Sequence, residues 1–268
     1  MTIMKTAKTL IFLYLFVFSF IISSYIDGLA TTRKIPDKSE IPTLIKMTKS
    51  ENEEIRLDAA YKLGRINKRD LSDNIVKTLI DLLNDSNKDV VIESIMALGL
   101  LEINESIPFL TGKLNDKNAQ IIEFSAQSIG LIGTDSKRTI KKLISLLNHD
   151  SSSTRLISAF ALARIGKGAD YAIPVLVRSL KSNYLREQLE SIKVIELFGS
   201  KAALAVKPLI ELLQSPNQYI RKATCRALIA IGSKKALKAL ENHNEDCDTR
   251  WMGFRKHLKG VEIGPAET

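Results

Sequence analysis

Hydrophobic residues between positions 41 and 236 recur at helical spacing in paired short runs, and turns rich in Asn, Asp and Ser separate the two runs of each pair. The stretch KPLIELLQSPNQYIRKATCRALIAIGS (207–233) is one such pair, interrupted by QSPN. Each pair predicts a first helix of about ten residues and a second of about 12 to 13 residues. Two helices of this length cannot enclose a core alone, so each pair must pack against other pairs.

The paired runs are internal repeats. Residues 140–166 and 206–232 share one outline, and residues 41–66 and 76–101 repeat it at a looser period. Four glycines follow one another at intervals of 33 residues: Gly133, Gly166, Gly199 and Gly232. Each ends a predicted second helix, where a residue with positive φ is expected. We therefore predict six helix–turn–helix units over residues 41–236.

The repeated pattern is P-x-L-I-x-L-L, then V/I-R, then A-x-x-A-L-x-x-I-G. It resembles HEAT repeats, and its 33-residue length resembles the short HEAT-like repeats of phycobilisome-lyase-type proteins. The resemblance implies an all-α fold, a right-handed α-solenoid of about six repeats, with residues 237–268 as a C-terminal cap and tail. It indicates little about function, because such solenoids serve many purposes.

HEAT repeats often carry an Asp after the first helix and an Arg in the second, which form a ladder between neighbouring units. Arg56, Arg155 and Arg221 occupy the Arg position of this sequence. Asp85 and Asp116 occupy the Asp position, but in other units. The resemblance thus implies a partial ladder with a structural role.

The second helices line the concave face of HEAT-like solenoids, so this chain is expected to have a ridge there. At 100° per residue, its central column is Tyr61, Met96, Gln127, Phe160, Lys193 and Arg226. Flanking positions are Ile92, Leu100, Leu156, Arg164, Leu189 and Lys222. The ridge changes from aromatic and apolar to basic. It is either a groove for an elongated partner, or a set of side chains that pack between neighbouring helices with their cations solvated.

Charge is distributed unevenly along the chain. It carries 39 Lys and Arg against 30 Asp and Glu, a net charge of +9. Residues 31–136 hold 14 basic against 17 acidic residues, whereas residues 137–259 hold 23 against 10. The basic half favours an acidic partner. Charge alone does not separate an acidic protein segment from an anionic envelope polymer or a membrane surface.

The N-terminus has the pattern of a secretory signal. Two lysines precede a nearly uniform apolar run, residues 10–22, and Gly28 and Ala30 offer a cleavage site. Residues 1–30 would then be the signal and residues 31–40 a linker. An uncleaved membrane anchor is the alternative, at the short limit for a span, and a buried core helix is a third. The first two place the remainder outside the cytoplasm, in the periplasm or cell envelope or secreted.

The C-terminal segment breaks the repeat and contains the single tryptophan. It is either a terminal cap over the last apolar face, or a contact for a membrane surface or an acidic partner through Trp251, Arg255 and Lys256. Two cysteines, Cys225 and Cys247, could be joined as a disulfide in an oxidising compartment. A buried free thiol at Cys225 is equally compatible with the sequence.

Signatures of catalysis and of metal binding are not recognisable in this sequence. The three histidines form no HExxH or His-Glu pair, and two cysteines exclude a Cys₄ metal site. We therefore expect no catalytic residue, no metal and no cofactor, but a scaffold that binds a protein partner. A bilin-lyase-like enzyme or a cofactor chaperone is the alternative. Nucleic acid is not an expected partner, because export would separate the protein from the chromosome.

Overall fold

The computed structural model describes residues 35–134, 136–241 and 247. The chain consists of two compact units, residues 1–35 and residues 36–268, each held together by contacts within itself. All described residues except Ile35 belong to the second of these units. The predicted signal, residues 1–30, lies outside the described residues. So do three predicted contact residues of the C-terminal segment: Trp251, Arg255 and Lys256.

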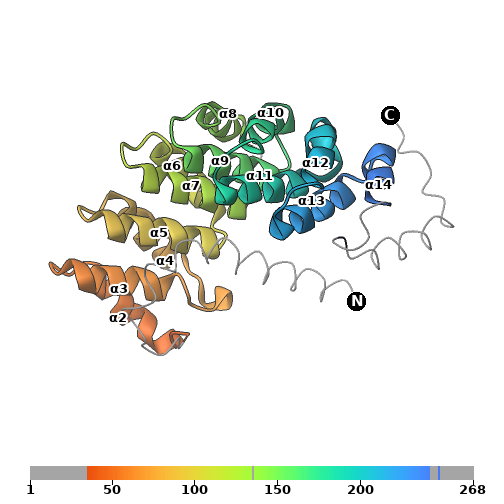
Figure 1. The fold of residues 1–268 in the computed structure, drawn as a ribbon. Helices are drawn as coiled ribbons and strands as arrows, with labels where there is room; N and C mark the ends of the chain where they lie inside the picture. Colours follow the sequence, from red (N-terminus) through yellow and green to blue (C-terminus); the bar gives the residue numbers. More distant parts are fainter. Residues whose placement is uncertain (1–34, 135, 242–246, 248–268) are drawn as a thin grey trace. The chain divides into compact units, whose positions relative to one another are not determined.

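Throughout its described parts the chain forms helices and no strand, arranged as six consecutive helix–turn–helix pairs (Figure 1). The first helices are α2 (Ile41–Met47), α4 (Asp73–Asp81), α6 (Ile107–Lys113), α8 (Lys137–Leu146), α10 (Ala169–Ser179) and α12 (Val206–Leu212). The second helices are α3 (Glu53–Leu63), α5 (Lys88–Leu100), α7 (Ala119–Ile132), α9 (Ser152–Ile165), α11 (Leu185–Phe198) and α13 (Gln218–Ile231). Short 3₁₀ helices extend or join them: η2 (Lys38–Glu40), η3 (Lys68–Asp70), η4 (Leu82–Asn84), η5 (Asn104–Ser106) and η6 (Gly199–Ala205). Helix α14 (Lys234–Leu240) follows the last pair.

The helices form two layers. Each first helix packs against the second helix of its own pair, and each second helix contacts the second helix that follows it. In Figure 1, α8, α10 and α12 form one row and α9, α11 and α13 the row beneath it. The core lies between the layers, where leucines such as Leu79, Leu98, Leu162 and Leu176 are fully buried. Each buried leucine contributes about 1.5–3 kcal/mol. The predicted all-α solenoid is confirmed.

The helix ends follow from the residues at the turns. Side chains accept backbone N–H groups at the start of five second helices, from the N-caps Asn52, Asn87, Asn118, Ser151 and Asn217. The periodic glycines end the last four, with φ of 78°, 75°, 56° and 66° at Gly133, Gly166, Gly199 and Gly232. A side chain would be strained at these angles. The glycine C-caps predicted from the period are therefore confirmed.

The Arg positions of the repeat hold the turns. Arg56 pairs with Asp85 of the next unit through two hydrogen bonds of 2.7 and 2.8 Å. Each Arg at this position also donates to two carbonyl oxygens of the turn before its own helix: Arg56 to Ser50 and Glu51, Arg155 to His149 and Asp150, and Arg221 to Ser215 and Pro216. Asp116 accepts the backbone N–H of Asn118 instead. The Asp–Arg ladder is partial, as predicted.

Small residues allow neighbouring second helices to approach closely. Twelve residues after the N-cap, the first three second helices carry Gly64, Gly99 and Gly130. A Cβ atom on Gly64 would lie 2.7 Å from Ala97 Cβ, and one on Gly99 would lie 2.5 Å from Ser128 Oγ. A Cβ atom on Gly130 would lie 2.8 Å from Ala161 Cα. All three partners belong to the following second helix. These glycines are required by the packing and not by a positive φ, although Gly64 is also the C-cap residue of α3.

The last unit is joined to the segment that follows α14 by a disulfide. Cys225 of α13 and Cys247 are bonded, with their Cα atoms 5.5 Å apart, and both are buried. In the preceding unit, the position equivalent to Cys225 is Ile192, which is also fully buried. The disulfide thus holds Cys247 against a buried position of α13.

Replacing Gly130 by alanine should destabilise the protein by about 1–3 kcal/mol, because the new methyl group would meet the backbone of α9. Gly112 of α6 is the matched control, since it lies in a helix with open space at its Cβ position. Gly112→Ala should stabilise by up to about 1 kcal/mol. Urea midpoints of the two variants provide the measurement, and equal shifts would contradict the packing described above.

Candidate functional site

The second helices present one continuous row of residues opposite the core. This central column lies nine residues after the N-cap of each second helix, and helical geometry directs it away from the first helices. Its members are Tyr61, Met96, Gln127, Phe160, Lys193 and Arg226. We call the surface formed by this column and its flanking residues the second-helix face. The structure thus places the predicted ridge residues at equivalent positions of successive units.

The first four units give this face an apolar character. Tyr61 is 41 % exposed, and Met96 and Phe160 are partly exposed. Gln127 between them is buried, and its Oε1 has no hydrogen-bond partner within the described chain. Flanking apolar residues are also partly exposed: Ile92, Leu100, Leu131 and Leu156. Apolar side chains gathered outside the core are typical of an interface.

An ion pair and a stacked ring mark the start of the face. The Arg65 guanidinium lies 3.4 Å from the centroid of the Tyr61 ring. The same guanidinium bonds Glu93 of the next unit at 2.9 Å. Burial raises the pKa of Glu93, and Arg65 acts in the opposite direction. Arg65 therefore links the first two units across the face.

The last two units give the face a charged character. Lys193 lies 3.7 Å from Glu190 of its own helix, and Arg226 of α13 lies 3.4 Å from Glu196 of α11. Sequence reasoning identified the two cations and missed both carboxylates. The spacing of Glu190 and Lys193 on one helix was a usable signal. Glu196 lies off the central column, so its pairing with Arg226 depends on how α11 and α13 pack.

Partial burial shifts the protonation of this cluster. It raises the pKa of Glu190, with Lys193 and Arg186 opposing the shift. It also raises the pKa of Glu196, with Arg226 and Lys193 opposing it. Desolvation lowers the pKa of Lys193, and Glu190 opposes that change. The carboxylates thus take up protons more readily than exposed ones do.

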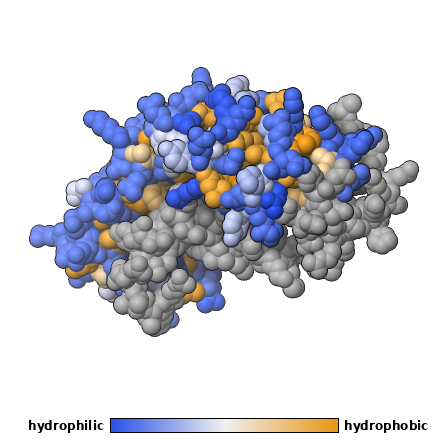
Figure 2. All heavy atoms as spheres, viewed as in Figure 1, coloured by the Kyte–Doolittle hydropathy of each residue, from blue (hydrophilic) through white to orange (hydrophobic). Residues whose placement is uncertain are grey.

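Two predicted residues of the face are exposed cations. Arg164 of α9 and Lys222 of α13 both have exposed side chains. They flank the central column beside Phe160 and Arg226 respectively. Seen from the side shown in Figure 2, the surface of the molecule is mostly hydrophilic. Hydrophobic residues reach the surface between the hydrophilic ones near the middle of this view.

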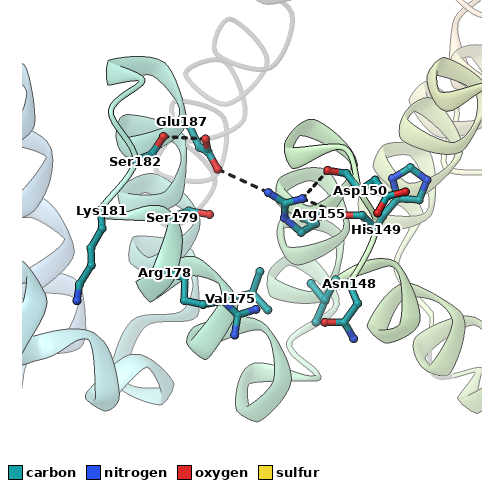
Figure 3. Close-up of a pocket in the computed structure, with 11 residues that line it drawn as sticks. Asn148, His149, Asp150, Arg155, Val175, Arg178, Ser179, Lys181, Ser182 and Glu187 are labelled. Carbon is teal, nitrogen blue, oxygen red and sulfur yellow. Dashed lines mark hydrogen bonds and ion pairs between the residues drawn. The ribbon is translucent and has the colours of Figure 1, made fainter.

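A separate open groove of about 610 Å³ lies between the fourth and fifth units, at the turns between first and second helices. Figure 3 shows Arg155 of α9 facing Glu187 of α11 across it, with a separation of 3.9 Å. Glu187 also accepts a hydrogen bond from Ser182. Arg155 also donates to the carbonyl oxygens of His149 and Asp150 in the turn before α9. Arg155 therefore has a structural role at this turn.

Metal binding has no candidate among the residues that the structure describes, because they contain no group of three or more His, Cys, Asp or Glu side chains placed to hold an ion. Every described helix is too short or too polar to cross a membrane.

A model of HEAT repeats matches residues 41–130 and 185–251. More than half of the chain is therefore matched, and the protein belongs to the HEAT repeat family. The predicted family is confirmed. No curated protein matches the chain.

Solved structures support the same fold. The complex of CpcE and CpcF of phycocyanin lyase from Nostoc sp. PCC7120 has a TM-score of 0.57 at 20 % identity, over 88 % of this chain and 94 % of that one. YibA of Escherichia coli has a TM-score of 0.59 at 20 % identity, over 79 % and 77 %. A designed armadillo repeat protein in complex with the peptide (KR)4 has a TM-score of 0.52 at 19 % identity, over 72 % and 99 %. The predicted likeness to the phycobilisome-lyase type is confirmed at the level of the fold.

Proposed function

We propose that the protein is an exported scaffold that binds an elongated protein segment along its second-helix face. The observation that carries the proposal is the continuous column opposite the core, with partly exposed Met96 and Phe160 in one half and exposed Arg226 in the other. An apolar surface beside exposed cations fits a segment that carries apolar and acidic side chains. The proposal assigns binding to the protein and no catalytic step.

Two related repeat proteins support a protein partner in general. The designed armadillo repeat protein is in complex with a peptide, and CpcE is in complex with CpcF. The acidic character of the partner is inferred from this chain alone. Residues 137–259 carry 23 basic against 10 acidic residues, and such a field attracts an anionic partner and speeds its association.

Export is proposed from the N-terminal pattern of two lysines and a long apolar run. The Cys225–Cys247 disulfide supports it, because disulfides persist in oxidising compartments.

Protein isolated from its native host without reductant should therefore begin near Thr31 and be lighter than the reduced form by two hydrogen atoms. Intact mass spectrometry of both forms measures this. A full-length chain in the cytosol with two thiols would contradict export.

Reversing the charge at two exposed positions of the face should weaken partner binding. We expect the double variant Arg164→Glu/Lys222→Glu to lose roughly tenfold in affinity, because like charges would then face an acidic segment. The control is Lys141→Glu/Lys207→Glu, which makes the same charge change on exposed residues of α8 and α12.

The measurement is quantitative co-purification from the exported fraction of the native host. Equal capture by both double variants would remove the second-helix face as the binding surface. A coloured molecule that co-purifies with the wild-type protein and is retained by both variants would favour a bilin-lyase-like enzyme or cofactor chaperone instead.

A further inference from the structure

Glu196 occupies a position that the first four units keep small. Twelve residues after the N-cap, the first four second helices carry Gly64, Gly99, Gly130 and Ala163. The fifth carries Glu196 at this position. Packing at the earlier junctions excludes even a methyl group from the three glycine positions. The junction between α11 and α13 instead accommodates a full carboxylate side chain, which extends toward the second-helix face.

The carboxylate meets a cation of the central column. Glu196 Oε2 lies 3.4 Å from Arg226 Nε, and Glu190 Oε1 lies 3.7 Å from Lys193 Nζ. Side-chain exposures are 32 % for Glu196, 53 % for Arg226, 29 % for Glu190 and 24 % for Lys193. Two cations of the face are thus balanced by two carboxylates of the same chain, and all four side chains remain accessible to solvent.

We propose that Glu190 and Glu196 are built-in competitors for an acidic partner: they pair with Lys193 and Arg226 in the unbound protein, and carboxylates of the partner segment replace them on binding. This inference rests on the proposed function, since it concerns the same face and the same protein partner. In addition, the affinity for the partner depends on how readily its carboxylates replace those of Glu190 and Glu196.

The exchange is physically accessible because ion pairs at partly exposed positions are weak. A counter-charge stabilises exposed Arg226 and, more strongly, the less exposed Lys193, and the internal carboxylates supply it without a partner. Among the described residues, no carboxylate forms an ion pair with exposed Arg164 or Lys222, and these two cations would attract a segment with several acidic side chains. A partner therefore gains contacts with Arg164 and Lys222 in addition to those with Lys193 and Arg226, where its carboxylates replace the internal ones.

The exchange also predicts a dependence on pH. The charged groups that act on the two carboxylates are Arg186 and Lys193 of α11 and Arg226 of α13. On the elements packed against α11, Arg155 of α9 pairs with Glu187, and Lys201 of η6 donates to the carbonyl of Gly166.

Burial raises the pKa of both carboxylates, so they are protonated before the exposed carboxylates of a partner as pH falls. Protonation removes the two negative charges of Glu190 and Glu196, so these carboxylates no longer compete with those of the partner for Lys193 and Arg226. Binding of an acidic segment should therefore strengthen between neutral pH and the ordinary carboxylate range.

The test uses the full mature protein and a rhodamine-labelled peptide of eight aspartates, with binding followed by fluorescence anisotropy at pH 7.5 and 5.5. Glu190→Gln/Glu196→Gln mimics the protonated pair. It should bind the peptide roughly tenfold more tightly than wild type at pH 7.5 and should lose most of the wild-type gain at pH 5.5. Circular dichroism checks that the variant folds, and the single variant Glu196→Gln should give an intermediate affinity.

The matched control is Glu105→Gln/Glu211→Gln, which removes two exposed carboxylates elsewhere. An equal gain in both double variants would show non-specific attraction to a basic protein and would overturn the proposal, as would no gain in either. If Arg164→Glu/Lys222→Glu does not weaken capture of the native partner, the proposed function fails whatever the peptide shows. If that variant weakens capture while Glu190→Gln/Glu196→Gln binds the peptide as wild type does, only the exchange is wrong.

Discussion

Close contact between consecutive second helices is the constraint on which the rest of the structure depends. At the first three junctions, a glycine allows the following second helix to approach so closely that a Cβ atom on the glycine would have no room. Because equivalent positions meet at successive junctions, the helix pairs stack and residues opposite the core form one continuous surface. Neither helix of a pair could bury its apolar side alone. The packing that stabilises the protein thus also creates the second-helix face.

The junction between α11 and α13 departs from this pattern, and the character of the face changes there. Where Gly130 admits only a hydrogen atom against α9, Glu196 brings a carboxylate to Arg226 of α13. An ion pair between neighbouring second helices thus takes part in the packing at this junction. The first units present partly exposed apolar residues such as Met96 and Phe160 on the second-helix face. The last units present cations there, each paired with a carboxylate of the same chain.

The sequence was sufficient to predict the helix pairs, because the 33-residue period and glycine C-caps such as Gly166 are local signals. Helical geometry also located Lys193 and Arg226 on one column. It did not reveal that Gly130 meets Ala161, or that Glu196 meets Arg226, since both contacts depend on how neighbouring helices pack. The export signal and the Trp251 contact stay predictions, as they fall on residues outside the described structure.

Photo-crosslinking tests the central claim most directly, namely that a protein partner lies along the second-helix face. Benzoylphenylalanine would replace Phe160 on this face or, in a separate variant, Phe109 on α6, a first-helix residue that is 49 % exposed. Illumination in the exported fraction of the native host should join the partner to position 160 and not to position 109. Crosslinking at position 109 alone, or equally at both positions, would contradict the account.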